Sequence, residues 1–115
     1  MDKVEFLDKF VFYGLENLND GSDTSTIRYF SEADFKKVLE RVEKLNIVIH
    51  GIEPWKDGTC YDLLCSEDFD QKEAGPAWYW EAFQRFIDTG EELKYAASYD
   101  VHEHLIKGTK RGNKT

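Results

Sequence analysis

The sequence predicts an α+β domain, in which a mainly antiparallel sheet of four to five strands carries two main helices on one face. One observation is a helical apolar stripe that starts just after a serine near residue 31. Another is a second stripe that starts at a proline near residue 76, with short β-branched or alternating segments before and after it. Helices and strands that alternate in this way are typical of a sheet covered by helices on one face.

The segment 32–45 has the clearest helical pattern. Ser31 is a favourable N-cap, and Asn46 stands where a left-handed C-cap residue is expected. Apolar residues recur at spacings of three and four between them: Phe35, Val38, Leu39, Val42 and Leu45. We therefore expect this stripe to face the core.

Residues 47–65 are predicted to form a β-hairpin. A β-branched strand covers 47–53, a turn over 54–58 ends in Asp-Gly, and a second strand returns over 59–65. Asp62 lies in the middle of the returning strand, so it must face either solvent or a partner.

A second helix and a last strand follow. Pro76 opens the helix and Gly90 closes it. Its buried stripe is expected to comprise Trp78 or Tyr79, Ala82, Phe83, Phe86 and Ile87. In the strand at 93–101, alternation places four residues on one face: Tyr95, Ala97, Tyr99 and Val101.

Three short elements are expected before residue 31. Alternation over 9–15 predicts a strand, while 2–8 favours a short helix leading into it, and 26–30 favours a further short strand. With an N-terminal strand the order becomes β-α-β-β-α-β, for which a ferredoxin-like layout is the simplest topology. The second face of the sheet would then be partly open.

The 115 residues predict a single domain over 1–106, followed by a basic tail over 107–115 that we expect to be disordered. The net charge is −8, although the tail contains only basic charges, so the domain itself is strongly acidic. Such a domain repels nucleic acid and anionic membranes and attracts basic protein surfaces. We expect no direct nucleic-acid or membrane partner, and a monomer or weak homodimer in isolation.

The cysteines and the N-terminus indicate a cytoplasmic protein. Cys60 and Cys65 are predicted to be small buried thiols, as in a reducing compartment. The first residues carry acids and precede no long apolar stretch, which argues against a secretory signal.

Signals for catalysis or metal binding are weak. His102 and His104 would point the same way on an extended chain, but a metal site needs a further ligand, such as His50. Cys60 would act as a nucleophile only beside an imidazole, for which His50 is the candidate. We therefore predict no catalytic residue, no metal, no cofactor and no enzymatic activity.

The strongest functional signal combines aromatic and acidic residues on the hairpin and in the loop after it. The expected partner-binding residues are Glu53, Trp55, Asp57, Asp62, Glu67, Asp68 and Asp70. An aromatic anchor ringed by acids suits a basic protein surface. In the alternative interpretation Trp55 packs under its own turn and the acids are only solvated.

Four segments resemble small bacterial immunity proteins, which are encoded beside polymorphic toxins of contact-dependent growth-inhibition and colicin-like systems. They are YFSEADF at 29–35, IHGIEPW at 49–55, WYWEAF at 78–83 and YAASY at 95–99. The resemblance implies a cytoplasmic protein that neutralises a cognate toxin, often a nuclease with a basic cleft, by one-to-one binding. It implies no particular binding residue, because such proteins share no binding motif.

Two other functions stay open at this point. The acidic surface would also suit a nucleic-acid mimic that inhibits a host or phage-defence complex. An open sheet face would suit a small-ligand or enzymatic module with His50, Cys60 or Tyr99 in a pocket.

Overall fold

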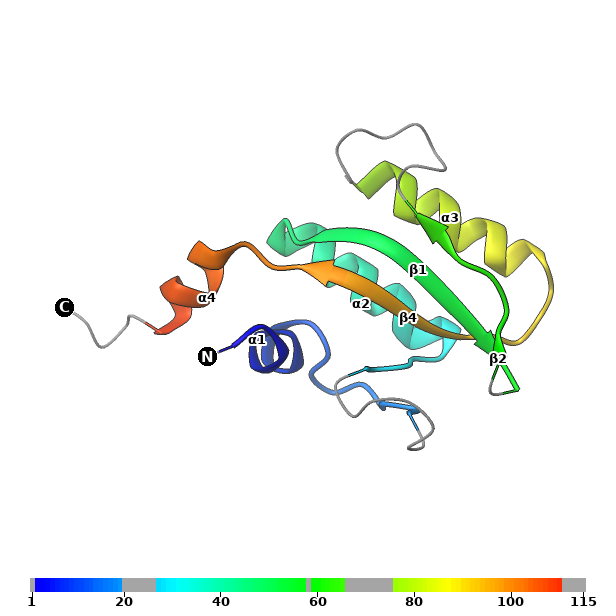
Figure 1. Cartoon of the computed structure of the whole chain (residues 1–115), viewed down its shortest axis with the longest axis horizontal. Helices are drawn as coiled ribbons and strands as arrows, with labels where there is room; N and C mark the ends of the chain where they lie inside the picture. The colour runs from blue at the N-terminus through cyan, green and yellow to red at the C-terminus, as the bar shows by residue number, and fades with distance from the viewer. Residues whose placement is uncertain (1, 20–26, 58, 66–75, 111–115) are drawn as a thin grey trace.

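The computed structural model describes residues 2–19, 27–57, 59–65 and 76–110, and it is an α+β fold as predicted (Figure 1). The elements follow in the order α1 (Lys3–Phe10), α2 (Glu32–Leu45), β1 (Val48–Lys56), β2 (Thr59–Cys60), β3 (Leu64–Cys65), α3 (Pro76–Asp88), β4 (Lys94–Asp100) and α4 (Glu103–Lys110). None of the described helices has the length and apolarity needed to cross a bilayer.

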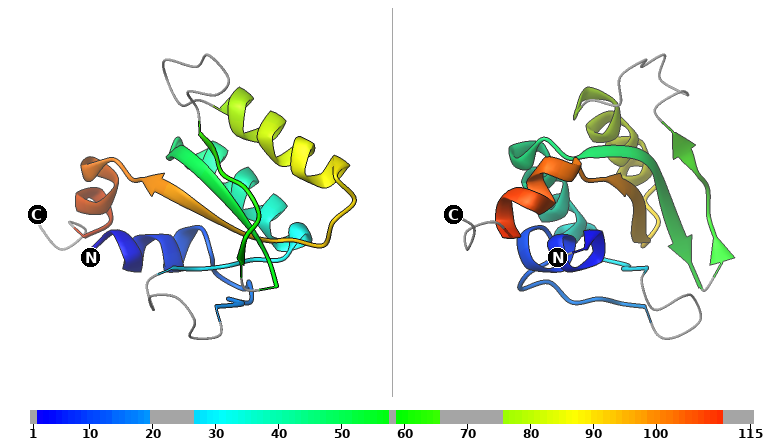
Figure 2. Two further views of the ribbon diagram at one scale, coloured as in Figure 1. Left: turned by 45° about the vertical axis from the view of Figure 1, so that its right-hand side comes forward. Right: turned by 60° about the vertical axis from the view of Figure 1, so that its left-hand side comes forward.

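The sheet is antiparallel and only three strands across, with β1 in the centre. β4 pairs along one edge of β1, while β2 and β3 lie one after the other along its second edge (Figure 2). The sheet is therefore narrower than the four to five strands expected, because β2 and β3 share one edge of β1. The predicted hairpin over 47–65 is present, but its returning strand is interrupted.

Pro54 explains the interruption. Its carbonyl accepts a hydrogen bond from the Tyr61 N–H at 2.8 Å, so its backbone faces the edge between β2 and β3. Proline has no N–H to return the second bond of a regular antiparallel pair. Regular pairing therefore stops after Cys60 and resumes only at Leu64.

The strand predicted at 9–15 is wrong, because α1 extends over Lys3–Phe10 and residues 11–14 form turns, whereas the short helix predicted at 2–8 is confirmed. Asp2 and Glu5 form a capping box, in which each side chain accepts a hydrogen bond from the other residue's backbone N–H. This cap fixes the start of the helix, and the apolar run at 10–13 comprises its last residue and the turn that follows. Without that strand the order is not β-α-β-β-α-β, and the ferredoxin-like topology does not apply.

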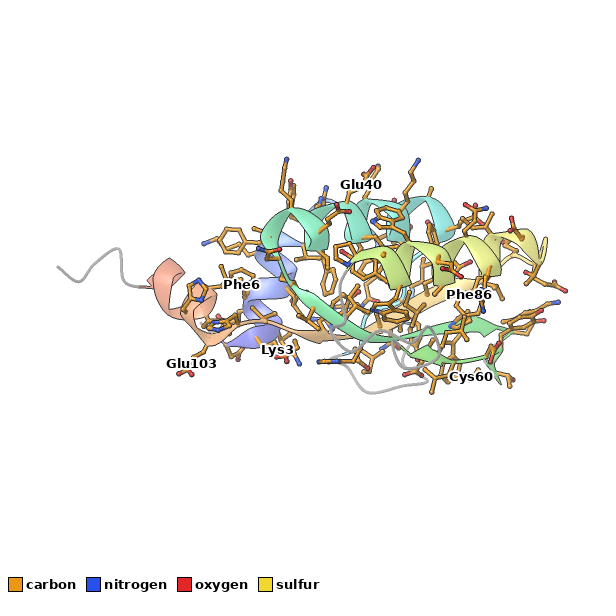
Figure 3. The ribbon with its side chains drawn as sticks, turned by 90° about the horizontal axis from the view of Figure 1, so that it is seen from above. Lys3, Phe6, Glu40, Cys60, Phe86 and Glu103 are labelled. Atoms are coloured by element: carbon orange, nitrogen blue, oxygen red, sulfur yellow. The ribbon has the colours of Figure 1, made fainter. Side chains whose placement is uncertain are left out.

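Helices α2 and α3 cover one face of the sheet, as expected (Figure 3). Ser31 caps α2 by accepting the N–H of Asp34, and Asn46 ends it in a left-handed conformation with φ 59°. Gly90, at φ 77°, follows α3. The two predicted stripes enter one aromatic core, where Phe35 stacks on Tyr95 with ring centroids 5.1 Å apart.

The outer edge of β4 meets the chain just before α2. Phe30 and Tyr95 exchange both backbone hydrogen bonds, at 2.9 and 2.8 Å, as an isolated antiparallel bridge. This bridge is all that the structure shows of the short strand expected at 26–30 within the described residues.

Helix α4 extends to Lys110, so residues 107–110 are helical rather than part of a disordered tail. The remainder of that segment, 111–115, lies outside the described residues.

Candidate protein-binding surface

The predicted binding residues separate into a described group and a group outside the described part of the chain. Glu53 and Trp55 lie on β1, and Asp57 and Asp62 lie on the turn and the returning segment of the hairpin. Glu67, Asp68 and Asp70 fall within 66–75, outside the described residues.

Residues 61–63 are all exposed and include two large hydrophobic side chains. The side chains of Tyr61 and Leu63 are 42% and 50% exposed, and Asp62 between them is exposed as well. Tyr13, at 56%, is the only other exposed large hydrophobic residue in the described part of the chain. Neighbouring exposed apolar side chains with a polar rim indicate a binding site better than single exposed ones do.

Sequence reasoning missed Tyr61 and Leu63, because it treated 59–65 as one continuous strand. On a regular strand, alternation would place Tyr61 and Leu63 on the opposite face from Asp62. The signal that could have revealed them is Pro54, which leaves the segment opposite it without a regular partner.

Local geometry fixes the backbone at Asp57 and the carboxylate of Asp62. Asp57 has φ 52° in the turn between Lys56 and Thr59, which pair with each other, so it takes the left-handed conformation that tight hairpin turns require. Asp62 accepts a hydrogen bond from the Leu63 N–H at 2.8 Å, which holds its carboxylate beside the exposed leucine.

Glu53 belongs to the same group because of its position on β1. It lies on β1 between Ile52, which pairs with Leu64, and Trp55, which pairs with Cys60. It therefore stands beside the unpaired segment 61–63. We use the name hairpin surface for Glu53, Asp57, Tyr61, Asp62 and Leu63.

Trp55 is not a fully exposed anchor. It is half-buried, and its ring meets Tyr29 edge-on with centroids 5.5 Å apart. Its indole Nε1 is buried with no hydrogen-bond partner among the described residues. Trp55 therefore packs against the rest of the protein near the hairpin turn, and the exposed apolar contact area belongs to Tyr61 and Leu63.

Lys56 is the basic residue at the hairpin turn, and Glu91 largely offsets its charge. Its Nζ lies 2.6 Å from a Glu91 carboxylate oxygen, and this hydrogen bond and ion pair raise the pKa of Lys56. Lys94, which pairs with Trp55, is a further basic residue near the turn, and the carboxylates of Glu53, Asp57 and Asp62 outnumber it.

The candidate catalytic groups do not come together. His50 lies 3.4 Å from Asp100, and both are exposed. Cys60 pairs with Trp55, five positions along β1 from His50, which corresponds to about 16 Å at the rise of a strand. Cys60 is exposed rather than buried as expected, and its thiol contacts only the carbonyl of Asp62, at 3.1 Å, among the described partners.

His102 and His104 lie close together, with their Nδ1 atoms 2.7 Å apart. This pair is satisfied when one nitrogen donates a proton and the other accepts it. In the described part of the chain, three or more potential metal ligands do not gather anywhere.

Tyr99, the remaining candidate for a ligand pocket, has a buried hydroxyl without a partner among the described residues. Burial raises its pKa, so the hydroxyl stays protonated well above neutral pH.

Comparison of the chain with protein-family models, with curated proteins and with solved structures gives no match.

Proposed function

We propose that this protein binds a basic protein partner through the hairpin surface, and that the partner is a toxin whose activity it blocks. The observation that carries the proposal is that Tyr61 and Leu63 are both exposed, one on each side of Asp62 in the chain, at the acidic edge of the sheet.

The chemistry of the surface suits a protein partner. Interface energy concentrates in a few apolar or aromatic side chains that become fully desolvated, surrounded by polar groups that exclude water. Tyr61 and Leu63 are positioned for the first role, and Glu53, Asp57 and Asp62 for the second.

The charge of the surface favours a basic partner. Carboxylates on the rim accelerate the encounter with a positive surface, and those that become buried against Arg or Lys add affinity. A toxin that acts on nucleic acid has a basic cleft, which the same carboxylates would occupy in place of phosphates. The acidic composition of the domain adds to this attraction over longer distances.

The direct experiment is affinity capture of the partner with matched variants as bait. We expect the wild-type protein to retain one stoichiometric partner in low salt. Asp57→Lys with Asp62→Lys should reduce capture at least tenfold, and Tyr61→Ala with Leu63→Ala should do the same without changing the charge.

The control is Glu40→Lys on α2, which reverses one charge on the far side of the molecule from Cys60 of the hairpin (Figure 3). It should retain the partner as the wild type does. If the hairpin variants and the Glu40 variant all bind equally well, the hairpin surface is not the binding site.

The toxin assignment needs a functional readout. Expression of the captured partner alone should arrest growth, and co-expression of this protein should restore it, whereas the hairpin variants should not. A captured partner that is harmless to the cell and belongs to a host defence complex would replace the toxin assignment with the nucleic-acid-mimic alternative.

A further inference from the structure

A groove lies between α1 and the outer edge of β4. Helix α1 lies beside β4, at the opposite edge of the sheet from β2, β3 and the hairpin surface (Figures 1 and 2). The groove encloses about 410 Å³. One wall is α1, with Lys3, Val4 and Leu7; the other includes Ile27 and Arg28, and residues 97–99 of β4 lie between them. This volume is within the range of about 300–1,000 Å³ that is typical of ligand pockets.

The part of β4 that lines the groove is an unpaired strand edge. Tyr95 directs its N–H and C=O away from β1, because both are bonded to Phe30. Backbone groups of every second residue in a strand point to the same edge, so those of Ala97 and Tyr99 also point away from β1 and toward the groove. Neither residue has a backbone partner on this edge within the described ranges.

The chain itself does not continue the pairing: the Phe30–Tyr95 bridge is isolated, and Arg28, the next residue that would face β4, forms no further bridge with Ala97 within the described ranges. The carbonyl of Tyr29 accepts the Leu18 N–H at 2.7 Å, and the carbonyl of Ile27 accepts the side-chain amide of Asn19 at 2.9 Å. The segment therefore leaves β4 after the Phe30 bridge and opens a space beside Ala97 and Tyr99.

The charged residues that line this groove are basic, although the protein is acidic overall. Arg28 is held in place by Asp8, which accepts hydrogen bonds from its Nε and Nη2 at 3.1 and 3.0 Å. Lys3 is exposed at the start of α1, and no ion pair of its side chain is found among the described residues. The remaining side chains of the walls are mainly apolar.

From this arrangement we propose that the groove binds an extended acidic segment of a partner protein, which adds as a strand to the outer edge of β4. The backbone of the segment bonds to Ala97 and Tyr99 and continues the antiparallel pairing that Phe30 begins. Its apolar side chains contact Val4 and Leu7, and an acidic side chain pairs with Lys3. The chain's own C-terminal segment, 107–115, does not suit this role because its charges are basic.

This site is independent of the hairpin surface, since it lies at the opposite edge of the sheet and has the opposite charge preference. Failure of one proposal leaves the other intact.

The test uses the full chain labelled with ¹⁵N and a capped peptide of alternating glutamate and valine as the probe. In low salt, we expect chemical-shift changes centred on residues 97–99 and α1, and at least tenfold slower hydrogen exchange at the Ala97 and Tyr99 amides. A peptide with lysine in place of glutamate should bind at least tenfold more weakly. Equal binding of both peptides, or shifts centred on 59–64, would overturn the proposal.

Backbone methylation of the peptide tests strand addition directly. Two peptides, methylated on alternate amides, should differ, because only every second N–H of an added strand faces β4. One should lose binding and the other should keep it. If both bind as the unmethylated peptide does, the ligand is not held by strand addition.

Two variants of the protein complete the test. Ala97→Pro removes an N–H that points away from β1, so it should leave the β1–β4 ladder intact and abolish peptide binding. Lys3→Glu places an acid in the first turn of α1, where the helix dipole tolerates it, and should weaken binding at least fivefold. Lys36→Glu on α2 is the matched control and should bind normally.

Folding of each variant is checked by circular dichroism. If Ala97→Pro does not fold, Lys3→Glu and the methylated peptides decide the question. Normal binding by a folded Ala97→Pro variant would refute the proposal.

Discussion

Tyr95 and Tyr61 both belong to the sheet region of this protein, but Tyr95 is completely buried, whereas 42% of the Tyr61 side chain is exposed. Tyr95 lies on a regular strand whose alternation directs it into the core under α2 and α3. Tyr61 lies where Pro54 interrupts the pairing, so no alternation directs it inward. The same residue type thus contributes to stability on the helix-covered face and is available for binding at the hairpin edge.

The largest expected effect is on the helix-covered face. Phe35→Ala removes a completely buried ring that stacks on Tyr95 and meets Phe83 edge-on. We expect the free energy of unfolding to fall by about 3–5 kcal/mol, as for other buried Phe→Ala changes. Urea denaturation followed by circular dichroism measures it. A loss below about 1 kcal/mol would mean that the face packs loosely and that the contrast with the hairpin edge is wrong.

The next effect is a loss of stability in alkali. Burial raises the pKa of Tyr95 to about 12, and it also raises the pKa of Tyr79 and Tyr99. Above pH 10 the unfolded chain releases these protons while the folded protein retains them, so the free energy of unfolding falls as pH rises. Each tyrosine contributes about 1 kcal/mol per pH unit between the unfolded and folded pKa values, and nothing below pH 10.

Tyr95→Phe checks this account at the helix-covered face. Its hydroxyl has no partner among the described residues, so removing it should leave stability at pH 7 unchanged or slightly higher. The slope of stability against pH above 10 should become shallower. A clear loss of stability at pH 7 would show that the hydroxyl has a hydrogen-bond partner, such as a bound water.

The sequence correctly predicted the elements for which several local signals agree. For α2, the Ser31 cap, the apolar stripe and Asn46 indicate one helix, and the structure has it at Glu32–Leu45. Pro76 and Gly90 marked α3 in the same way. In β4 the alternation alone was sufficient, because the strand is covered by helices on one face only.

The sequence failed where one local signal allows two structures. The apolar run at 10–13 looked like part of a strand, but only Phe10 lies in a regular element, as the last residue of α1, and turns follow it. The returning strand of the hairpin looked regular, since its interruption depends on Pro54 across the sheet. The acidic part of the candidate site was visible in the sequence, but its apolar part was not.

A smaller effect separates two positions with positive φ. Asn46 ends α2 at φ 59°, and Asp57 lies in the hairpin turn at φ 52°. Replacing either with alanine places a less tolerant residue in the left-handed region, at a cost of about 1 kcal/mol. We expect Asn46→Ala to lower global stability, because α2 covers the sheet. Asp57→Ala should mainly increase local opening of β2, which is only two residues long.

Hydrogen exchange distinguishes these two outcomes. Faster exchange confined to the amides around Thr59 and Cys60 is expected for Asp57→Ala, with the β1–β4 ladder unchanged. If the whole sheet exchanges faster, the hairpin edge is coupled to the core, and the two regions are not energetically separate.

The smallest effect on stability belongs to the residues that we propose to matter most for binding. Because Tyr61 and Leu63 are already exposed, Tyr61→Ala combined with Leu63→Ala removes little buried area. The free energy of unfolding should change by no more than about 0.5 kcal/mol, measured by the same urea denaturation as Phe35→Ala. A loss of about 2 kcal/mol or more would mean that these side chains pack against the rest of the protein in solution. They would then not be free to contact a partner, and the proposed division between a stabilising face and a binding edge would not hold.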